Sequence, residues 1–192
     1  MPKVIYLTGA PAAGKSSTMR LLTTRAPGLL VWEYGARLAE HITARCTAIV
    51  HQDELRTRSA AVVMPEDVDE VDRALVAFVN RHRGSRPIII DSHAVTREEY
   101  GYRITPFSLD RFVRLAPDEI WVLFASPEAT RARIAADAAG RLMVCEEEAR
   151  MHTTLQASVA ATYGMSLGRP VYFFDTGTRQ DELVDRLARR LA

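Results

Sequence analysis

Lysine is scarce in this sequence, and several other features are missing. Of the 25 lysine and arginine residues, only Lys3 and Lys15 are lysines. The formal net charge is only +1, which argues against a protein that binds nucleic acid through a strongly basic face. No apolar run approaches the roughly 18 residues that a membrane-spanning helix needs. The sequence therefore predicts a protein whose partners include neither nucleic acid nor a membrane.

Cysteine is also rare. Cys46 and Cys145 lie far apart and match no metal-binding spacing. No signal peptide is visible before the first apolar run, so we expect reduced thiols and a cytoplasmic location. With 47% hydrophobic and 26% charged residues, the 192 residues are ordinary for a globular protein and most simply form one domain, 1–192. The sequence does not indicate an oligomeric state.

A glycine-rich segment surrounds the second lysine. Residues 9–16 read Gly-Ala-Pro-Ala-Ala-Gly-Lys-Ser and fit G-x-x-x-x-G-K-[ST], the phosphate-binding loop (P-loop, or Walker A motif). An apolar run precedes the segment and a helix start follows it, as this motif requires. The predicted nucleotide-binding residues are Gly9, Ala10, Pro11, Ala12, Ala13, Gly14, Lys15, Ser16 and Ser17.

The spacing of this loop has a chemical reason. Gly9 and Gly14 permit the backbone angles and close approach that turn several N–H groups toward a triphosphate. The following helix points its positive dipole end at the phosphates. Lys15 would reach the β- and γ-phosphates, and the Ser16 hydroxyl would hold Mg²⁺. ATP and Mg²⁺ are therefore the expected ligands.

Short apolar runs alternate with helical segments along the chain, which predicts the α/β class. Continuous apolar runs, rather than alternating ones, are typical of a parallel sheet covered on both faces. The long excursions after the second and fourth runs are candidates for covering the nucleotide. The expected strands are 3–8, 29–33, 87–91, 119–125 and 170–175.

Polar residues that follow these strands are candidates for the chemistry. Asp91 ends the third strand, where an acidic residue faces the Mg²⁺ of many P-loop proteins, although it also suits a turn. His93 suits either a substrate phosphate or a structural turn. Arg131, Arg133 and Arg141 follow the fourth strand; each is either a solvated helix residue or a cation that stabilises charge on a transferred phosphoryl group.

In its motifs the chain resembles the archaeal-type adenylate kinases, within the nucleoside monophosphate kinases. The resemblance covers nearly the whole length and is sharp in patches. These patches are Thr8–Ser17, Tyr34-Gly35, Asp91-Ser92-His93 with Gly101-Tyr102, Ala116–Ile120 with Ala125-Ser126, and Ala161–Gly164.

The resemblance implies a P-loop NTPase three-layer sandwich. Its five-stranded parallel sheet would have the order 2-3-1-4-5, with helices on both faces. It implies transfer of the ATP γ-phosphoryl to a nucleoside monophosphate, with an acceptor-binding segment at about 35–86 and a short lid at about 126–150. The residues implied are Tyr34, Gly35, Arg56 and His93 for the acceptor, Lys15, Asp91, Arg133 and Arg141 for catalysis, Asp175 near the donor adenine, and Ser16 and Asp91 for the metal.

The chain departs from the family pattern in three places. Ala12 replaces a loop glycine, which we expect to require a negative φ. Gln156-Ala157 stands where the family has Asn-Arg, and the aromatic-bearing loop from Tyr102 lacks the family's Pro-Gly pair. These departures keep two alternatives open. One is a P-loop kinase of a small-molecule hydroxyl with Asp91 as base, and the other is a slow ATPase that acts as an assembly or regulatory factor.

Overall fold

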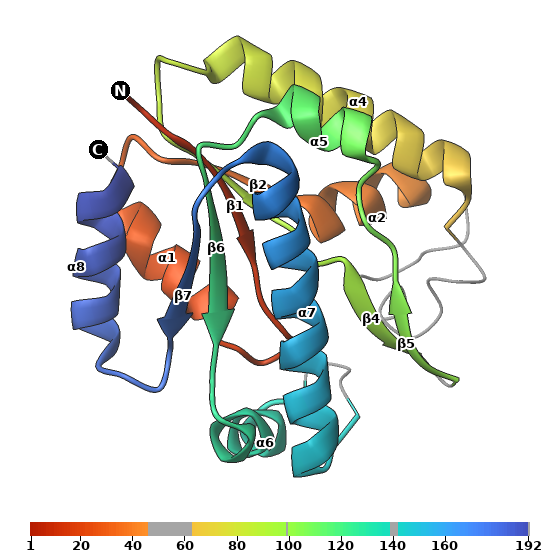
Figure 1. The fold of residues 1–192 in the computed structure, drawn as a ribbon, viewed down its shortest axis with the longest axis vertical. Helices are drawn as coiled ribbons and strands as arrows, with labels where there is room; N and C mark the ends of the chain where they lie inside the picture. The colour runs from red at the N-terminus through yellow and green to blue at the C-terminus, as the bar shows by residue number, and fades with distance from the viewer. Residues whose placement is uncertain (46–62, 99, 139–141, 192) are drawn as a thin grey trace.

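The computed structural model describes residues 1–45, 63–98, 100–138 and 142–191. A parallel five-stranded sheet with the order β2-β3-β1-β6-β7 forms its centre, and β4 and β5 form a separate antiparallel hairpin (Figure 1). The strands are β1 (Val4–Thr8), β2 (Leu30–Glu33), β3 (Ile88–Asp91), β4 (Val95–Glu98), β5 (Gly101–Ile104), β6 (Glu119–Phe124) and β7 (Val171–Asp175).

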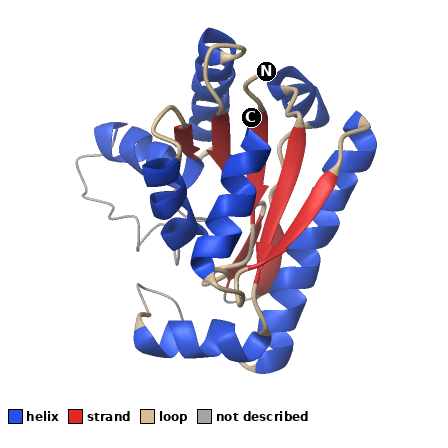
Figure 2. Ribbon diagram, turned by 90° about the vertical axis from the view of Figure 1, so that its left-hand side faces the viewer, coloured by secondary structure: helices blue, strands red, loops and turns tan. Residues whose placement is uncertain are grey.

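Helices cover both faces of this sheet. Helices α1 and α8 lie on one face, and α4, α5 and α7 lie on the other; Figure 2 shows the strands between the two groups. The helices are α1 (Lys15–Arg25), α2 (Tyr34–Arg45), α4 (Pro65–His82), α5 (Leu109–Leu115), α6 (Pro127–Ala136), α7 (Glu146–Leu167) and α8 (Gln180–Leu191). In the described part of the chain, no helix is long and apolar enough to cross a membrane.

The core is divided by the sheet into two layers. On β1, Val4 and Tyr6 pack toward α4, α5 and α7, while Ile5 and Leu7 pack toward α1 and α8. Successive strand residues point to opposite faces, so a strand covered on both sides needs apolar residues at every position. This arrangement confirms the predicted α/β three-layer fold. It also confirms the order 2-3-1-4-5, when the strands of this sheet are numbered among themselves.

The hairpin β4–β5 was not predicted from the sequence. Its strands carry several polar residues, and helix α7 holds it in place. Gln156 accepts a hydrogen bond from the backbone N–H of Val95 at 3.2 Å, and the His152 ring nitrogen Nε2 lies 3.1 Å from the Val95 carbonyl. Arg97 forms an ion pair with Glu148 in the first turn of α7. Contacts from a helix 51 to 61 residues away in sequence thus stabilise a segment with a weak local signal.

A buried carboxylate joins the two ends of the chain, away from the P-loop. Glu119 begins β6 and is 5% exposed. It accepts hydrogen bonds from Trp121 Nε1 at 2.9 Å and Arg190 Nε at 2.7 Å, and Lys3 Nζ lies 3.2 Å away. Burial raises the pKa of Glu119, but these hydrogen bonds and charges lower it by a larger amount. The pKa of Glu119 therefore lies below its usual value of 4.5.

We expect this carboxylate to make the stability of the protein fall in acid. A folded-state pKa below that of the unfolded chain adds stability above about pH 4.5, and that stability is lost as the pH falls through the folded-state pKa. Glu119→Gln should cost about 2 kcal/mol at pH 7, the scale of a hydrogen bond to a charged group, and should flatten the acid limb. Urea unfolding between pH 7 and pH 3 measures both effects. The exposed Glu40→Gln is the control, and identical acid limbs for Glu119→Gln and wild type would contradict the expectation.

Candidate active site

The predicted P-loop connects the end of β1 to the start of α1, and its two glycines serve different purposes. A Cβ added at Gly9 would lie 2.4 Å from the carbonyl oxygen of Leu123 in β6, so only glycine fits against that strand. Gly14 caps α1 with φ 85° and ψ 14°, the left-handed region that glycine adopts without strain. The first glycine thus allows close packing, and the second allows the turn into the helix.

Ala12 does not have the backbone angle expected of it. Its φ is +60°, so the prediction of a negative φ at this position is wrong. An L-residue with a Cβ is disfavoured in the left-handed region. The loop therefore holds an alanine in a conformation that glycine adopts more easily, and other contacts must compensate for the strain.

Hydrogen bonds within the loop orient its side chains and backbone. The Ala13 N–H donates to the Ala10 carbonyl at 3.1 Å, which closes a tight turn. Lys15 Nζ donates to the Gly9 carbonyl at 3.0 Å, so the ammonium group folds back over the loop. Ser16, the second residue of α1, is exposed. The loop thus presents the Lys15 ammonium and the exposed Ser16 hydroxyl at the N-terminus of a helix. This arrangement suits the binding of an anion together with its metal cation.

The hydroxyl of Ser17 forms hydrogen bonds within the protein. Its Oγ donates to the Gly14 carbonyl at 3.0 Å and lies 3.1 Å from Gln180 Nε2 at the start of α8. Ala10 is buried and Pro11 is half-buried. These residues shape the loop rather than present chemical groups.

Two carboxylates end neighbouring strands beside this loop. Asp91 ends β3 and is paired in the sheet register with Glu33, which ends β2. The pKa of Asp91 is raised above its usual value. Burial is the largest cause and the Glu33 carboxylate adds to it, while the Lys15 ammonium lowers the pKa. Glu33 is exposed, and it forms no ion pair with any described residue. Sequence reasoning missed Glu33, although its position at the end of an apolar run is the signal that identified Asp91.

Arg133 of α6 contacts the loop directly. Its Nη1 donates to the Ala12 carbonyl at 3.1 Å and to Thr176 Oγ1 at 3.0 Å, and its Nη2 donates to the Thr176 carbonyl at 2.9 Å. Thr176 Oγ1 also lies 2.8 Å from the Ala13 carbonyl. The preceding residue, Asp175, is exposed, and its carboxylate accepts the Gly177 N–H at 2.7 Å. The resemblance points to Asp175 with Thr176 at the end of this strand, and Thr176 is the one of the two that contacts the P-loop.

Of the other predicted arginines, the structure describes Arg131, which does not contact the loop. Arg131 is exposed, and its Nη1 lies 3.4 Å from Glu146. Arg56 and Arg141 lie outside the described residues. Their assignments to the acceptor and the lid stay predictions.

The predicted acceptor residue Tyr34 has its hydroxyl engaged. That hydroxyl donates to Asp72 Oδ1 at 2.7 Å, and Arg111 Nη1 donates to the other oxygen of the same carboxylate at 2.7 Å. The Tyr34 ring meets Phe107 edge-on at 5.3 Å. Burial raises the pKa of the Tyr34 hydroxyl, and Asp72 raises it further. Tyr34 thus joins α2 to α4, and its ring is the part left for any substrate contact.

The remaining acceptor candidates lie near the same edge of the sheet. Gly35 is the second residue of α2 and is half-buried. His93 is exposed, in the short connection between β3 and β4. Of the aromatic loop residues, Phe107 packs on the core beside Tyr6, and the Tyr102 hydroxyl donates to the Glu148 carbonyl at 2.7 Å. Both side chains are half-buried.

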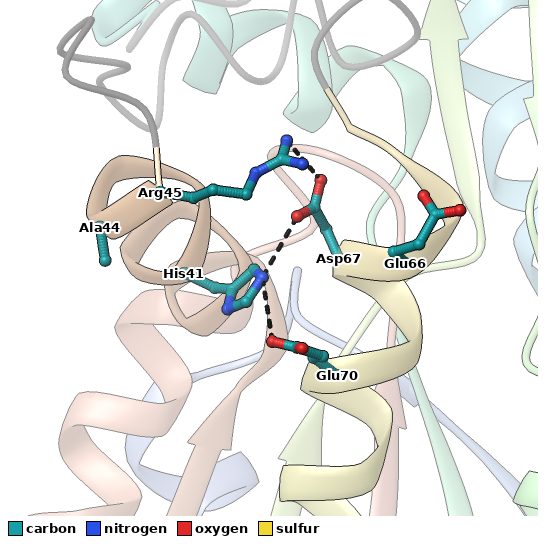
Figure 3. A pocket seen from close by; sticks show the side chains of 6 residues that line it. All are labelled: His41, Ala44, Arg45, Glu66, Asp67 and Glu70. Carbon is teal, nitrogen blue, oxygen red and sulfur yellow. Dashed lines mark hydrogen bonds and ion pairs between the residues drawn. The ribbon is translucent and has the colours of Figure 1, made fainter.

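An open hollow of about 350 Å³ lies between α2 and α4, and no residue of the P-loop lines it. Figure 3 shows Arg45 and His41 of α2 turned toward the buried Asp67 of α4. Arg45 Nη2 donates to Asp67 at 3.0 Å, and the His41 ring nitrogen lies 3.2 Å from the same carboxylate. The Met64 N–H also donates to Asp67 at 2.9 Å. These groups satisfy one another and fasten the two helices.

Gln156 occupies one of the positions where the chain departs from the resembled family. It is 1% exposed, donates to the hydroxyl of Thr8 and accepts from Val95. Thr8 is the residue that leads into the P-loop, so Gln156 fixes the strand end on which the loop begins. Alanine at 157 supplies no charge in place of the family's arginine.

Comparison with known proteins agrees with this geometry. A family model described as an AAA domain matches residues 8–150, a span that contains the whole P-loop. The chain belongs to this family. Curated adenylate kinases are relatives: that of Thermococcus onnurineus is 27% identical over 167 residues, and that of Pyrococcus horikoshii is 28% identical over 170 residues. In both cases the alignment covers 86% of this chain and 82% of the relative.

These relatives confirm the resemblance to archaeal-type adenylate kinases and support a P-loop phosphotransferase as the enzyme class. Solved structures agree on the fold alone. A sugar kinase from Janibacter sp. HTCC2649 has a TM-score of 0.52 at 16% identity, covering 98% of this chain and 94% of its own. The protein TT1252 from Thermus thermophilus has a TM-score of 0.53 at 17% identity, covering 99% of this chain and 96% of its own.

Proposed function

We propose that this protein transfers the γ-phosphoryl group of Mg·ATP to a nucleoside monophosphate in the cytoplasm. The observation that carries the donor half is the P-loop, with Gly9 packed on β6 and Lys15 folded over the loop. The adenylate kinase relatives support the acceptor half. The oxygen of an acceptor phosphate is already anionic, so transfer to it needs positioning and charge stabilisation rather than a general base.

The residues beside the loop suit a magnesium ion. The exposed Ser16 hydroxyl and the Asp91 carboxylate would hold it, since Mg²⁺ takes few protein oxygens and keeps several waters. When bound, Mg²⁺ neutralises charge on the β- and γ-phosphate oxygens. The chain itself contributes the Lys15 ammonium and the N-terminus of α1, which hold the phosphates for in-line attack.

We assign the acceptor to the segment of about 35–86 and a short lid to about 126–150, within one domain spanning 1–192. Tyr34, Gly35, Arg56 and His93 would contact the acceptor, and Asp175 would lie near the donor adenine. Arg141 would supply lid charge, and closure of the lid would exclude water and so suppress hydrolysis of ATP.

An acceptor screen tests this proposal. Purified protein with Mg·ATP is assayed against nucleoside monophosphates, sugars and hydroxy acids, with ADP and phosphorylated products followed by ³¹P NMR. We expect a monophosphate to accelerate ADP formation and to appear as its diphosphate. Slow ADP release that no acceptor accelerates would overturn the kinase proposal and favour the ATPase-type assembly or regulatory factor.

A second candidate function is phosphorylation of a small-molecule hydroxyl, and the position of Glu33 favours it. A hydroxyl acceptor needs a base, and Glu33 and Asp91 end adjacent strands beside the P-loop. Asp91 is the carboxylate that we assign to the magnesium ion, which leaves Glu33 available to a hydroxyl. A carboxylate accepts a hydrogen bond from a hydroxyl, whereas it repels an anionic phosphate acceptor.

Glu33→Gln separates the two candidates. If the acceptor is a hydroxyl, we expect turnover to fall by about 100-fold or more, the contribution of a general base. If the acceptor is a monophosphate, removing the negative charge should leave turnover equal or higher. The exposed Glu40→Gln serves as the control, because among the described residues Glu40 pairs only with Arg37, at 3.0 Å on the surface of α2.

A further inference from the structure

Ala12 has an unfavourable backbone conformation in the middle of the P-loop. Its φ of +60° places a Cβ where L-residues are disfavoured, and only one other non-glycine residue in the described chain, Ala116, has a positive φ. Such a conformation persists only where surrounding contacts compensate for it. The contacts on the Ala12 peptide therefore decide whether the loop holds its shape before a nucleotide arrives.

Two side chains from elsewhere in the fold hold this part of the loop. Arg133 Nη1 donates to the Ala12 carbonyl at 3.1 Å, and Thr176 Oγ1 lies 2.8 Å from the Ala13 carbonyl. Arg133 also bonds both the hydroxyl and the carbonyl of Thr176, so the two residues form one unit, which we call the brace. A Cβ added at Gly14 would lie 3.3 Å from Arg133 Nη1 and 3.4 Å from Thr176, so the brace rests against the loop.

The brace also sets the direction of the loop's N–H groups. The C=O and N–H of one peptide point in opposite directions, because the peptide unit is planar and trans. With the Ala13 carbonyl directed at Thr176, the Gly14 N–H of the same peptide points the opposite way, away from Thr176. We expect that N–H to face a bound phosphate.

We infer that Arg133 is a positioning residue that keeps the P-loop in its binding shape by holding Ala12, with Thr176 as its partner. This rests on the proposed function, in that the loop binds a nucleotide. Three N–H groups of the guanidinium are directed at neutral oxygens of the protein. Arg133 thus acts through the loop and not on the transferred phosphoryl group, in contrast to the lid role that the sequence implies.

The test uses five variants of the full chain: Arg133→Ala, Arg133→Lys, Ala12→Gly, the double variant Arg133→Ala with Ala12→Gly, and Arg131→Ala. Arg131 lies on the same helix, is exposed and pairs with Glu146, so its variant removes an arginine that does not contact the loop. Calorimetry measures the Kd for Mg·ADP. Hydrogen–deuterium exchange of residues 9–14 in the nucleotide-free protein reports the loop independently of any ligand.

We expect Arg133→Ala to weaken Mg·ADP binding by about 5- to 30-fold, the effect of leaving one strained residue uncompensated. Arg133→Lys should bind Mg·ADP nearly as weakly as Arg133→Ala, because an ammonium lacks the planar guanidinium fork that reaches both Ala12 and Thr176. Ala12→Gly should restore most of the affinity in the Arg133→Ala background, since glycine adopts a positive φ without help. Loop exchange should accelerate in Arg133→Ala and slow again in the double variant, and Arg131→Ala should match wild type.

The proposal is overturned if Arg133→Lys binds like wild type and Ala12→Gly gives no rescue, because the charge alone would then matter. It is also overturned if Arg133→Ala leaves the Kd unchanged and lowers only kcat. If the wild-type protein does not bind Mg·ADP, the proposed function fails instead. The exchange data on the nucleotide-free protein then still decide whether Arg133 holds the loop.

Discussion

Replacing Lys15 with alanine should lower the turnover of phosphotransfer by at least about 100-fold, the cost of removing one preorganised electrostatic donor. The ammonium is already in place, since Lys15 begins α1 and its Nζ lies 3.0 Å from the Gly9 carbonyl. A lysine at this position reaches the β- and γ-phosphates, where negative charge must be stabilised. No described carboxylate forms an ion pair with it, so we expect the variant to remain folded.

The measurement is the rate of ADP formation with the best acceptor from the screen, together with the thermal unfolding midpoint. Arg20→Ala is the matched control, because Arg20 is an exposed cation on the same helix. We expect that control to retain wild-type turnover. Near-normal turnover of Lys15→Ala at an unchanged unfolding midpoint would show that residues 9–16 are not the donor site.

Gly9→Ala should destabilise the fold by about 3 kcal/mol, the upper part of the range for overpacking a core. The new Cβ would lie 2.4 Å from the Leu123 carbonyl oxygen and 3.5 Å from the Leu123 Cβ. Leu123 is fully buried in β6, which is paired on both sides, so the strand has little room to move away. The loop would be displaced instead, and nucleotide binding should be lost together with stability.

Urea unfolding and the unfolding midpoint measure this effect, with an expected drop in Tm of about 6–12 °C. Gly28→Ala provides the matched control, because no atom lies within 4 Å of a Cβ added there. That variant should stay within about 0.5 kcal/mol of wild type, as surface substitutions do. Equal stability of the two variants would contradict the packing of the loop entrance against β6.

The strands of the central sheet and the P-loop could be predicted from sequence because their signals are local. The run Ile88–Asp91 is apolar at three successive positions, since both faces of its strand are covered. The hairpin Val95–Ile104 has no comparable signal, because distant residues of α7 such as Gln156 stabilise it. The comparisons support the enzyme class that the motifs predicted and leave the acceptor to the experiments above.

The sequence by itself determined that this chain has a parallel α/β fold with a P-loop after its first strand. The spacing of the glycines, the position of the lysine and the apolar runs are patterns among residues that lie close together in the chain, so they can be recognised without the tertiary structure. Only the tertiary structure decided that Ala12 has a positive φ, that Arg133 contacts the Ala12 carbonyl and Thr176 the Ala13 carbonyl, and that Glu33 ends its strand beside Asp91. Each of these features depends on segments that lie far apart in sequence and that the folded sheet brings to one edge. A local sequence pattern contains no information about such contacts.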